Sequence, residues 1–228
     1  MSNLLLLIIV VSGTVILYLT MRYTYARFPI AVLHPVLTST AIIILLLLVF
    51  NVSYESYMVG GKWIEKFLGP SVVALAYPLY NQRTVVIKYR NAIVLGVASG
   101  LLTAMGSILL FAKLFQFENE MIQSIIPKSI TTPVAIQLSS ALGGIPSLTA
   151  AFVMIAGFSG VILGPLVMKY TRIQSPLSKG LALGSASHAL GVAKSTEYGE
   201  LSLSMASVSM TLSAVAGSVV GPLFILLL

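Results

Sequence analysis

The sequence predicts an all-α integral membrane protein, and three observations lead to that fold class. Hydrophobic residues make up 57% of the 228-residue chain and charged residues only 8%, whereas soluble domains carry about a quarter charged residues. Mean hydropathy is +1.01. Apolar segments follow one another along the chain, separated by short polar loops. Their lengths are close to the about 20 residues that a helix needs to span a bilayer. A soluble enzyme is excluded on these grounds.

The apolar segments define the expected order of elements. No positively charged region precedes the first segment and no small-residue cleavage site follows it, so we expect a retained helix. The segments predict about seven crossings plus one re-entrant segment, built as two repeats with broken helices in a single membrane domain, 1–228. They are 3–21, 29–50, 63–82, 91–115, 127–144, 147–168, 177–195 and 201–228. The first helix is 3–21, repeat one is about 28–115, and repeat two is about 127–228.

Charged loops give the expected orientation. Loops 22–27, 83–90 and 169–179 carry eight Lys and Arg and no acid, so the positive-inside rule places them in the cytoplasm. The acidic loops near 51–57, 116–120 and 197–200 are then outside. This topology puts the N-terminus outside and the C-terminus inside, and it requires 127–144 to re-enter rather than cross.

Several kinds of chemistry are excluded by what the chain lacks. The formal net charge is +7, but the basic residues lie between apolar segments and form no contiguous face, so no nucleic-acid partner is expected. There is no Cys and no Asp, which removes thiol catalysis and any Ser/His/Asp triad. With only His34 and His188 available and no acid close to them, we expect no metal, no cofactor and no enzymatic activity.

The stretch from Pro127 to Pro133 is the most informative feature of the sequence. Proline breaks the helical hydrogen-bond ladder, and in hydrocarbon such a break persists only where protein or a water-filled cavity satisfies the freed groups. Lys128 adds a charge, and Ser129, Thr131 and Thr132 add hydroxyls. Alternatively, the lysine snorkels to the interface and the hydroxyls bond within their helix. We favour a broken helix that binds an anion, because a snorkelling lysine needs no break.

Other polar residues are weaker candidates. His188 lies among small residues between Gly184 and Gly191, two glycines that we expect to break the helix. There it can hydrogen-bond a substrate, carry a proton, or simply pack against backbone. Gln137 offers a further amide beside the broken segment.

The first half of the chain has a comparable short segment. Pro70 and Ser71 begin a piece that ends near Asn81, so a helix N-terminus at membrane depth can present amides to an anion; by itself the Gly-Pro pair is equally a simple turn. Glu197 and Glu200 are more typical of a solvated loop than of an acid/base pair.

A weak internal repeat connects the two halves. Pro29 and Pro35 have the same spacing as Pro127 and Pro133, and the Gly69 and Gly184 segments share an Ala-Leu pair five residues on. Interrupted short segments in corresponding positions of two halves indicate a transporter site.

Three stretches resemble the LrgB/CidB family of bacterial membrane proteins. They are LGPSVVALAYPLY at 68–80, PKSITTPVA at 127–135 followed by GGIP at 143–146, and HALG at 188–191. The resemblance covers about residues 28–228. One departure is visible, because the family commonly has Gly-Thr-Ala where this chain has Gly191, Val192 and Ala193. If that hydroxyl contacts substrate, Val192 changes the substrate.

The resemblance implies two competing functions in the bacterial plasma membrane. One is secondary transport of small monocarboxylates of the pyruvate or glycolate type; the other is an antiholin-like regulator of murein hydrolase export and autolysis. An LrgA/CidA-type membrane partner and homo-oligomers are expected with either. For transport, Lys128 supplies charge, the neighbouring hydroxyls and His188 orient the carboxylate, and helix starts near Ser71 and Gly184 add amides.

Overall fold

The computed structural model describes residues 3–28, 30, 33–74 and 76–226. These residues are helical apart from short connections, with no strand among them. The chain divides into two compact units, Met1–Ser71 and Val72–Leu228. The all-helical fold class is confirmed, and each unit is described separately.

Unit 1 contains α1 (Asn3–Arg27), α2 (Pro35–Val49) and α3 (Tyr54–Glu65). The first helix starts where the sequence predicts and continues beyond residue 21. Gly60 of α3 lies directly on α1, since a Cβ there would be 2.6 Å from the Cβ of Val10. The Thr14 and Tyr57 hydroxyls are 3.2 Å apart. Helix α4 (Leu68–Ala74) links this unit to the next.

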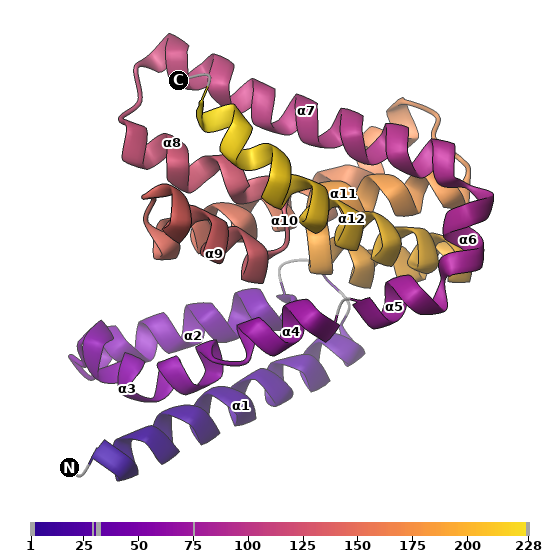
Figure 1. Ribbon diagram of the computed structural model, residues 1–228. Helices are drawn as coiled ribbons and strands as arrows, with labels where there is room; N and C mark the ends of the chain where they lie inside the picture. Colours follow the sequence, from indigo (N-terminus) through magenta and orange to yellow (C-terminus); the bar gives the residue numbers. More distant parts are fainter. Residues whose placement is uncertain (1–2, 29, 31–32, 75, 227–228) are drawn as a thin grey trace. The chain divides into compact units, whose positions relative to one another are not determined.

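Unit 2 is built around the long helices α7 (Arg90–Phe115), α10 (Pro146–Tyr170) and α12 (Glu200–Ile225), with α12 alongside α7 (Figure 1). These three helices and α1 are long and apolar enough to cross a membrane. Their outward faces carry large apolar side chains that suit lipid contact, whereas the buried faces combine large apolar residues with small ones. On α7 the outward residues include Leu95, Leu102, Leu110 and Leu114. The shorter helices of unit 2 are α5 (Ala76–Asn81), α6 (Arg83–Lys88), α8 (Asn119–Ile125), η2 (Ile126–Ser129), α9 (Thr132–Leu142), α11 (Pro176–Ser195) and η3 (Thr196–Tyr198).

Helices α8, η2 and α9 form a helical hairpin, which we call hairpin 1. Its two arms begin and end together, because the Ile145 amide donates to the Ser124 hydroxyl at 2.8 Å, 21 residues away along the chain. The tip is the extended pair Ile130 and Thr131. Pro133 lies in the first turn of α9, where its missing donor is harmless, and Pro127 lies in the same way at the start of η2. The two prolines therefore bracket the reversal that the sequence predicts between them.

Helix α11 also reverses, at His188, where the backbone is non-helical. Gly191 lies directly against the carbonyl group of Leu183, although eight residues of straight helix span about 12 Å. The Lys179 ammonium lies 4.7 Å from the centre of the Tyr198 ring. In a straight helix these two residues would lie at opposite ends. Residues 176–198 are thus a second helical hairpin, hairpin 2, whose tip is His188.

The two hairpins enter unit 2 from opposite ends of α10. Near the start of α10, the Thr149 hydroxyl lies 2.6 Å from the Ser139 hydroxyl and 2.9 Å from the Ser124 carbonyl oxygen, and so binds both arms of hairpin 1. Near the end of α10, Lys169 lines a cavity together with Lys179 and Tyr198 of hairpin 2. Both tips therefore point toward the middle of a helix about 37 Å long.

The reversal at His188 corrects two expectations. The segment 177–195 does not run through as one crossing, because its halves fold back on each other. Tyr198 therefore returns to the cavity that contains Lys169 and Arg172. The assignment of loop 197–200 to the side opposite 169–179 is wrong, since both loops lie at the same end of α10.

Gly184 was expected to break its helix, and this is also wrong, because α11 continues through it to His188. Gly184 instead allows close packing: a Cβ there would overlap the Ala206 carbonyl group and the Ser209 hydroxyl of α12. Backbone atoms cannot move aside as a flexible side chain can.

We therefore expect Gly184→Ala to destabilise the protein by about 1–3 kcal/mol, the cost of overpacking. The matched control is Gly106→Ala in α7, where a Cβ meets nothing within 4 Å; it should stabilise by about 0.5–1 kcal/mol through helix propensity. Thermal midpoints of the two purified variants provide the measurement. Equal midpoints would contradict the α11–α12 contact.

Candidate functional site

The tips of the two hairpins meet, and they bring together three residues singled out from the sequence. The His188 imidazole lies close to the backbone of Ser129 and to the Lys128 ammonium. Ser129 and His188 are buried. Lys128 comes from hairpin 1 and His188 from hairpin 2, so the constellation exists only when both hairpins are in place.

A cavity of about 270 Å³, which we call the central cavity, lies at this junction. Its walls come from α7, from the hairpin 1 tip, from the middle of α10 and from hairpin 2. The volume equals that of about nine liquid water molecules, which accommodates an anion of a few heavy atoms with some water. The lining residues are Gly100, Ala104, Lys128, Ser129, Ala156, Ser159, Gly160, Ser185 and Ala186.

Lys128 is the one charged residue in this lining, and no carboxylate accompanies it. Within the described part of the chain, Lys194 and Glu197 form an ion pair at 2.8 Å, and neither residue lines the cavity. A lysine at membrane depth is costly unless it is paired or faces water. The cavity therefore has the electrostatic character of an anion site.

His188 holds an unusual backbone conformation at the junction, with φ 51° and ψ −132°. Positive φ with this ψ is readily adopted by glycine and strained for other residues. The side chain is 3% exposed, and its Nε2 has no hydrogen-bond partner among the described residues. A strained and incompletely satisfied imidazole indicates that position 188 is kept for something other than the turn.

The remaining predicted residues gather less closely. Thr131 is buried and immediately precedes α9, and Thr132 is the first residue of that helix. Gln137, one and a half turns further along α9, is exposed and does not line the central cavity.

The candidates from the first half lie on short helices. Asn81 ends α5, is exposed and does not line the central cavity. Pro70 lies in the first turn of α4. The side chain of Ser71 lies outside the described part of the structure.

Small residues of α7 and α10 are the part of the site that the sequence did not identify. Gly100, Ala104, Ser159 and Gly160 line the central cavity, and sequence reasoning assigned such residues to packing. Their spacing at helical intervals was the feature of the sequence that could have indicated a shared face on each helix.

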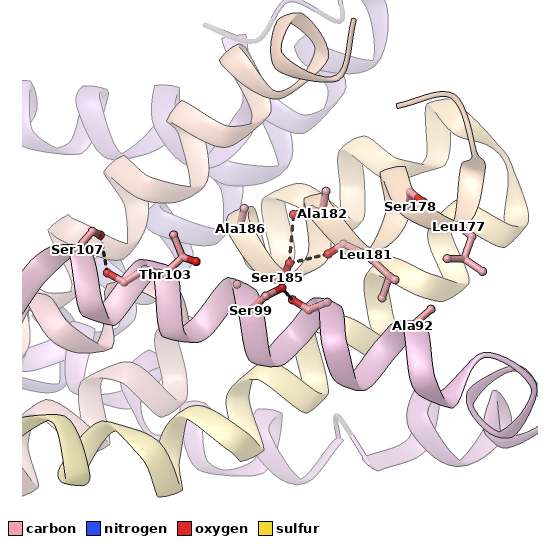
Figure 2. Close-up of a pocket in the computed structure, with 13 residues that line it drawn as sticks. Ala92, Ser99, Thr103, Ser107, Leu177, Ser178, Leu181, Ala182, Ser185 and Ala186 are labelled. Carbon is pink, nitrogen blue, oxygen red and sulfur yellow. Dashed lines mark hydrogen bonds between the residues drawn. The ribbon is translucent and has the colours of Figure 1, made fainter. Parts of the chain in front are cut away.

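The central cavity opens into a groove of about 650 Å³ between α7 and hairpin 2. The two share Gly100, Ala104, Ser185 and Ala186. Figure 2 shows small and hydroxyl side chains of the two helices along this groove, including Ser99, Thr103 and Ser185. Ser99 donates to Gly96 and Ser185 to Leu181 within their own helices, at 3.1 and 2.6 Å. The groove is thus polar enough for water yet needs no ligand to satisfy these hydroxyls.

Within the described residues, no three His, Cys, Asp or Glu side chains come together in a way that could hold a metal ion. The polar groups around Lys128 are hydroxyls and backbone amides, and the charge there is positive. These groups suit an anion and not a cation.

Long apolar helices, opposed hairpins and a polar junction between them define an all-α membrane protein. Comparison with known proteins identifies the group more closely. Residues 14–227 match the LrgB-like family, and the chain belongs to this family. The resemblance noted on the three sequence stretches is confirmed.

Relatives align over nearly their full length. The chain is 58% identical to the uncharacterized protein YxaC of Bacillus subtilis over 96% of this chain and 95% of that protein. It is 38% identical to the holin-like protein CidB of Staphylococcus aureus, over 94% and 93%. It is 35% identical to CidB of Staphylococcus epidermidis, over 100% and 99%. No solved structure matches the chain.

Proposed function

We propose that this LrgB-family protein is a secondary transporter of small monocarboxylates of the pyruvate or glycolate type. The observation that carries the proposal is the position of Lys128, an uncompensated cation in a cavity where two opposed hairpins meet, midway along a membrane-length helix. Broken helices whose ends meet near the midplane are the arrangement in which secondary transporters bind their substrates.

In this proposal each residue at the junction has a defined task. Lys128 binds the carboxylate as a point charge. Ser129, Thr131 and Thr132 supply hydrogen bonds at the start of α9, whose N-terminal amides carry a partial positive charge. The Nε2 of a neutral His188 can accept a hydrogen bond from the hydroxyl of a hydroxy acid such as glycolate, whereas donation to the keto oxygen of pyruvate requires the protonated imidazole. Each hairpin can then act as the gate to its own side of the membrane, since each enters from a different end of α10. No chemical transformation is required of the protein.

The proposal includes a topology in the bacterial plasma membrane. Applied to unit 2, the positive-inside rule places the hairpin 2 base, with Lys169, Arg172 and Lys179, in the cytoplasm. The hairpin 1 base is then outside, and α12 ends outside instead of inside. From Arg90 on, unit 2 contributes three crossings and two re-entrant hairpins, in place of the four crossings and one re-entrant segment expected there.

The absence of Cys from the chain allows this topology to be tested with single cysteines. We expect Gln174→Cys and Glu197→Cys to react with a membrane-impermeant maleimide from the cytoplasmic side. Glu118→Cys and Ser147→Cys should react from the outside. If positions 174 and 197 are labelled from opposite sides, residues 176–198 cross the membrane and the hairpin arrangement fails.

The two repeats, 28–115 and 127–228, form part of the same proposal. Pro35 begins α2 and Pro133 lies in the first turn of α9. The first half also has the short helices α4 and α5, and the second half has α11 with its reversal at His188. This order of elements supports a duplicated arrangement.

The direct test is flux of radiolabelled pyruvate and glycolate into proteoliposomes containing the purified protein, with and without an LrgA/CidA-type partner. Saturable flux above that of protein-free vesicles is expected. No flux under any ion gradient or pH, with complex formation verified, would contradict transport of these substrates.

The second candidate is an antiholin-like regulator of murein hydrolase export, which assembles with an LrgA/CidA-type partner. The printed name of the staphylococcal relatives, holin-like protein CidB, favours it. A regulator gives the junction no role in binding a solute, so substitutions confined to Lys128 and His188 would leave its effect on autolysis intact. Homo-oligomers are compatible with both functions.

A further inference from the structure

A second cavity lies at the base of hairpin 2, and its charge is more strongly positive than that of the central cavity. We call it the basic pocket; its volume is about 300 Å³. Three cations line it and no carboxylate does. The lining residues are Pro165, Met168, Lys169, Arg172, Ile173, Gln174, Lys179 and Tyr198.

The cations come from separate elements that the fold holds together. Arg172 follows the end of α10 with a positive φ of 56°, a backbone position usually given to glycine at helix C-termini. Lys179 belongs to the first arm of hairpin 2, and its ammonium lies over the Tyr198 ring. Glu197, the acid nearest to Tyr198 in sequence, pairs with Lys194 instead. The positive charges of the pocket are therefore left without a protein counter-ion in the lining.

An intermediate cavity of about 320 Å³ lies between the basic pocket and the central cavity and adjoins both. The intermediate cavity shares Met168 and Ile173 with the basic pocket. It shares Ser159, Gly160 and Ala186 with the central cavity. Three cavities thus follow α10 from its end to its middle, with cations at both ends of the series.

We propose that the basic pocket is a second anion-binding site, which holds a carboxylate or phosphate group. Three cations around one cavity attract an anion more strongly than separate surface charges do, because the low-dielectric walls focus their field. Its role as the cytoplasmic entrance to the central cavity rests on the proposed transport function, but the binding itself does not. The anion can be a free solute or the head group of an anionic lipid, since both offer the same oxygens.

Binding is tested on the full-length protein in detergent by thermal stabilisation with inorganic phosphate and with pyruvate, because a ligand that binds only the folded state raises the thermal midpoint. The key variant is Arg172→Gly with Lys179→Gln. Glycine suits the backbone at position 172, so the fold should tolerate it. The charge-matched control is Lys62→Gln with Lys113→Gln, which lies outside the basic pocket.

We expect phosphate to stabilise the wild type, the control and Lys128→Gln alike, and to bind the key variant at least about tenfold more weakly, as loss of two charge-assisted contacts implies. Wild-type phosphate affinity in the key variant would overturn the proposal. So would the absence of any effect of phosphate, pyruvate or anionic lipid on the wild type.

Two further arms identify the source of the anion and separate this proposal from transport. If micelles with phosphatidylglycerol, but not phosphatidylcholine, abolish the phosphate effect and stabilise the wild type more than the key variant, the site is supported with a lipid head group as its occupant. In transport assays, the key variant should raise the KM for carboxylate on the cytoplasmic side about tenfold and leave the outer KM unchanged. Phosphate binding that depends on Arg172 and Lys179, without any carboxylate flux, would keep the site and reject the transport function.

Discussion

Glycine at position 188 is expected to give a more stable protein than alanine at the same position, although both variants should transport carboxylate much less efficiently than the wild type. In an ordinary helix the order is reversed, because glycine is less favourable than alanine by about 0.5–1 kcal/mol. At φ 51° and ψ −132° any side chain is strained, at a cost of about 1–3 kcal/mol. Glycine alone removes that strain, while both substitutions remove the imidazole.

The loss of function has a separate cause. The imidazole lies close to the Ser129 backbone where the two hairpins meet, and its Nε2 lacks a partner among the described residues. A hydrogen bond to a charged ligand contributes about 1.5–3 kcal/mol, so its loss should lower kcat/KM about 10- to 100-fold. Strain retained at a site of ligand contact is a known feature of functional positions.

The comparison needs thermal midpoints and pyruvate flux for wild type, His188→Gly and His188→Ala. A glycine variant that transports at the wild-type rate would show that His188 serves only the turn. An alanine variant as stable as the glycine variant would contradict the backbone conformation on which hairpin 2 depends.

Hairpin 1 was predictable from sequence, whereas hairpin 2 was not. Prolines at 127 and 133 are disfavoured in a helix interior and tolerated in a first turn, so the two helix starts that they mark follow from local chemistry. His188 carries no such local signal: histidine does not demand positive φ, and the reversal is imposed by packing of Gly184 on α12 and Gly191 on Leu183. Sequence reasoning therefore chose His188 as a polar candidate but placed the break at Gly184.

The side assigned to loop 197–200 failed for a different reason. Acidic residues contribute little to membrane orientation, which is set by Lys and Arg. Glu197 was given weight that it does not have, and its partner Lys194 lies in the last turn of α11. A hairpin keeps both its ends on one side, so the basic residues of 169–179 decide the position of 197–200 as well.

The walls of the central cavity were missed because glycine, alanine and serine serve two purposes in membrane helices. The same small residues allow close helix packing and leave room for a ligand. Gly160 illustrates both, since it lines the central cavity and lies directly against the Ser187 hydroxyl. Only the three-dimensional meeting of α7, α10 and the hairpin tips distinguishes a cavity from a packed interface.

Lys128→Gln is expected to abolish saturable carboxylate transport and, at the same time, to stabilise the substrate-free protein. Lys128 is the one cation in the central cavity, so its removal leaves the substrate charge without a counter-ion at membrane depth. The loss of one charge-assisted contact corresponds to about 10- to 100-fold in binding. Without substrate, the uncompensated ammonium is itself unfavourable by about 2.5–3.5 kcal/mol at the centre of a bilayer, and glutamine avoids part of that cost.

Three variants separate charge from packing. Lys128→Arg keeps the charge but replaces a compact ammonium by a larger planar group, and it should retain partial transport with a raised KM. Lys113→Gln, at the exposed end of α7, removes an equal charge far from the junction and should transport normally. Pyruvate flux and the thermal midpoint with and without pyruvate measure both effects. A Lys128→Gln protein that still transports, or one that is less stable than wild type without substrate, would mean that the lysine is paired within the protein. The central cavity would then lose the uncompensated charge on which its assignment as an anion site depends.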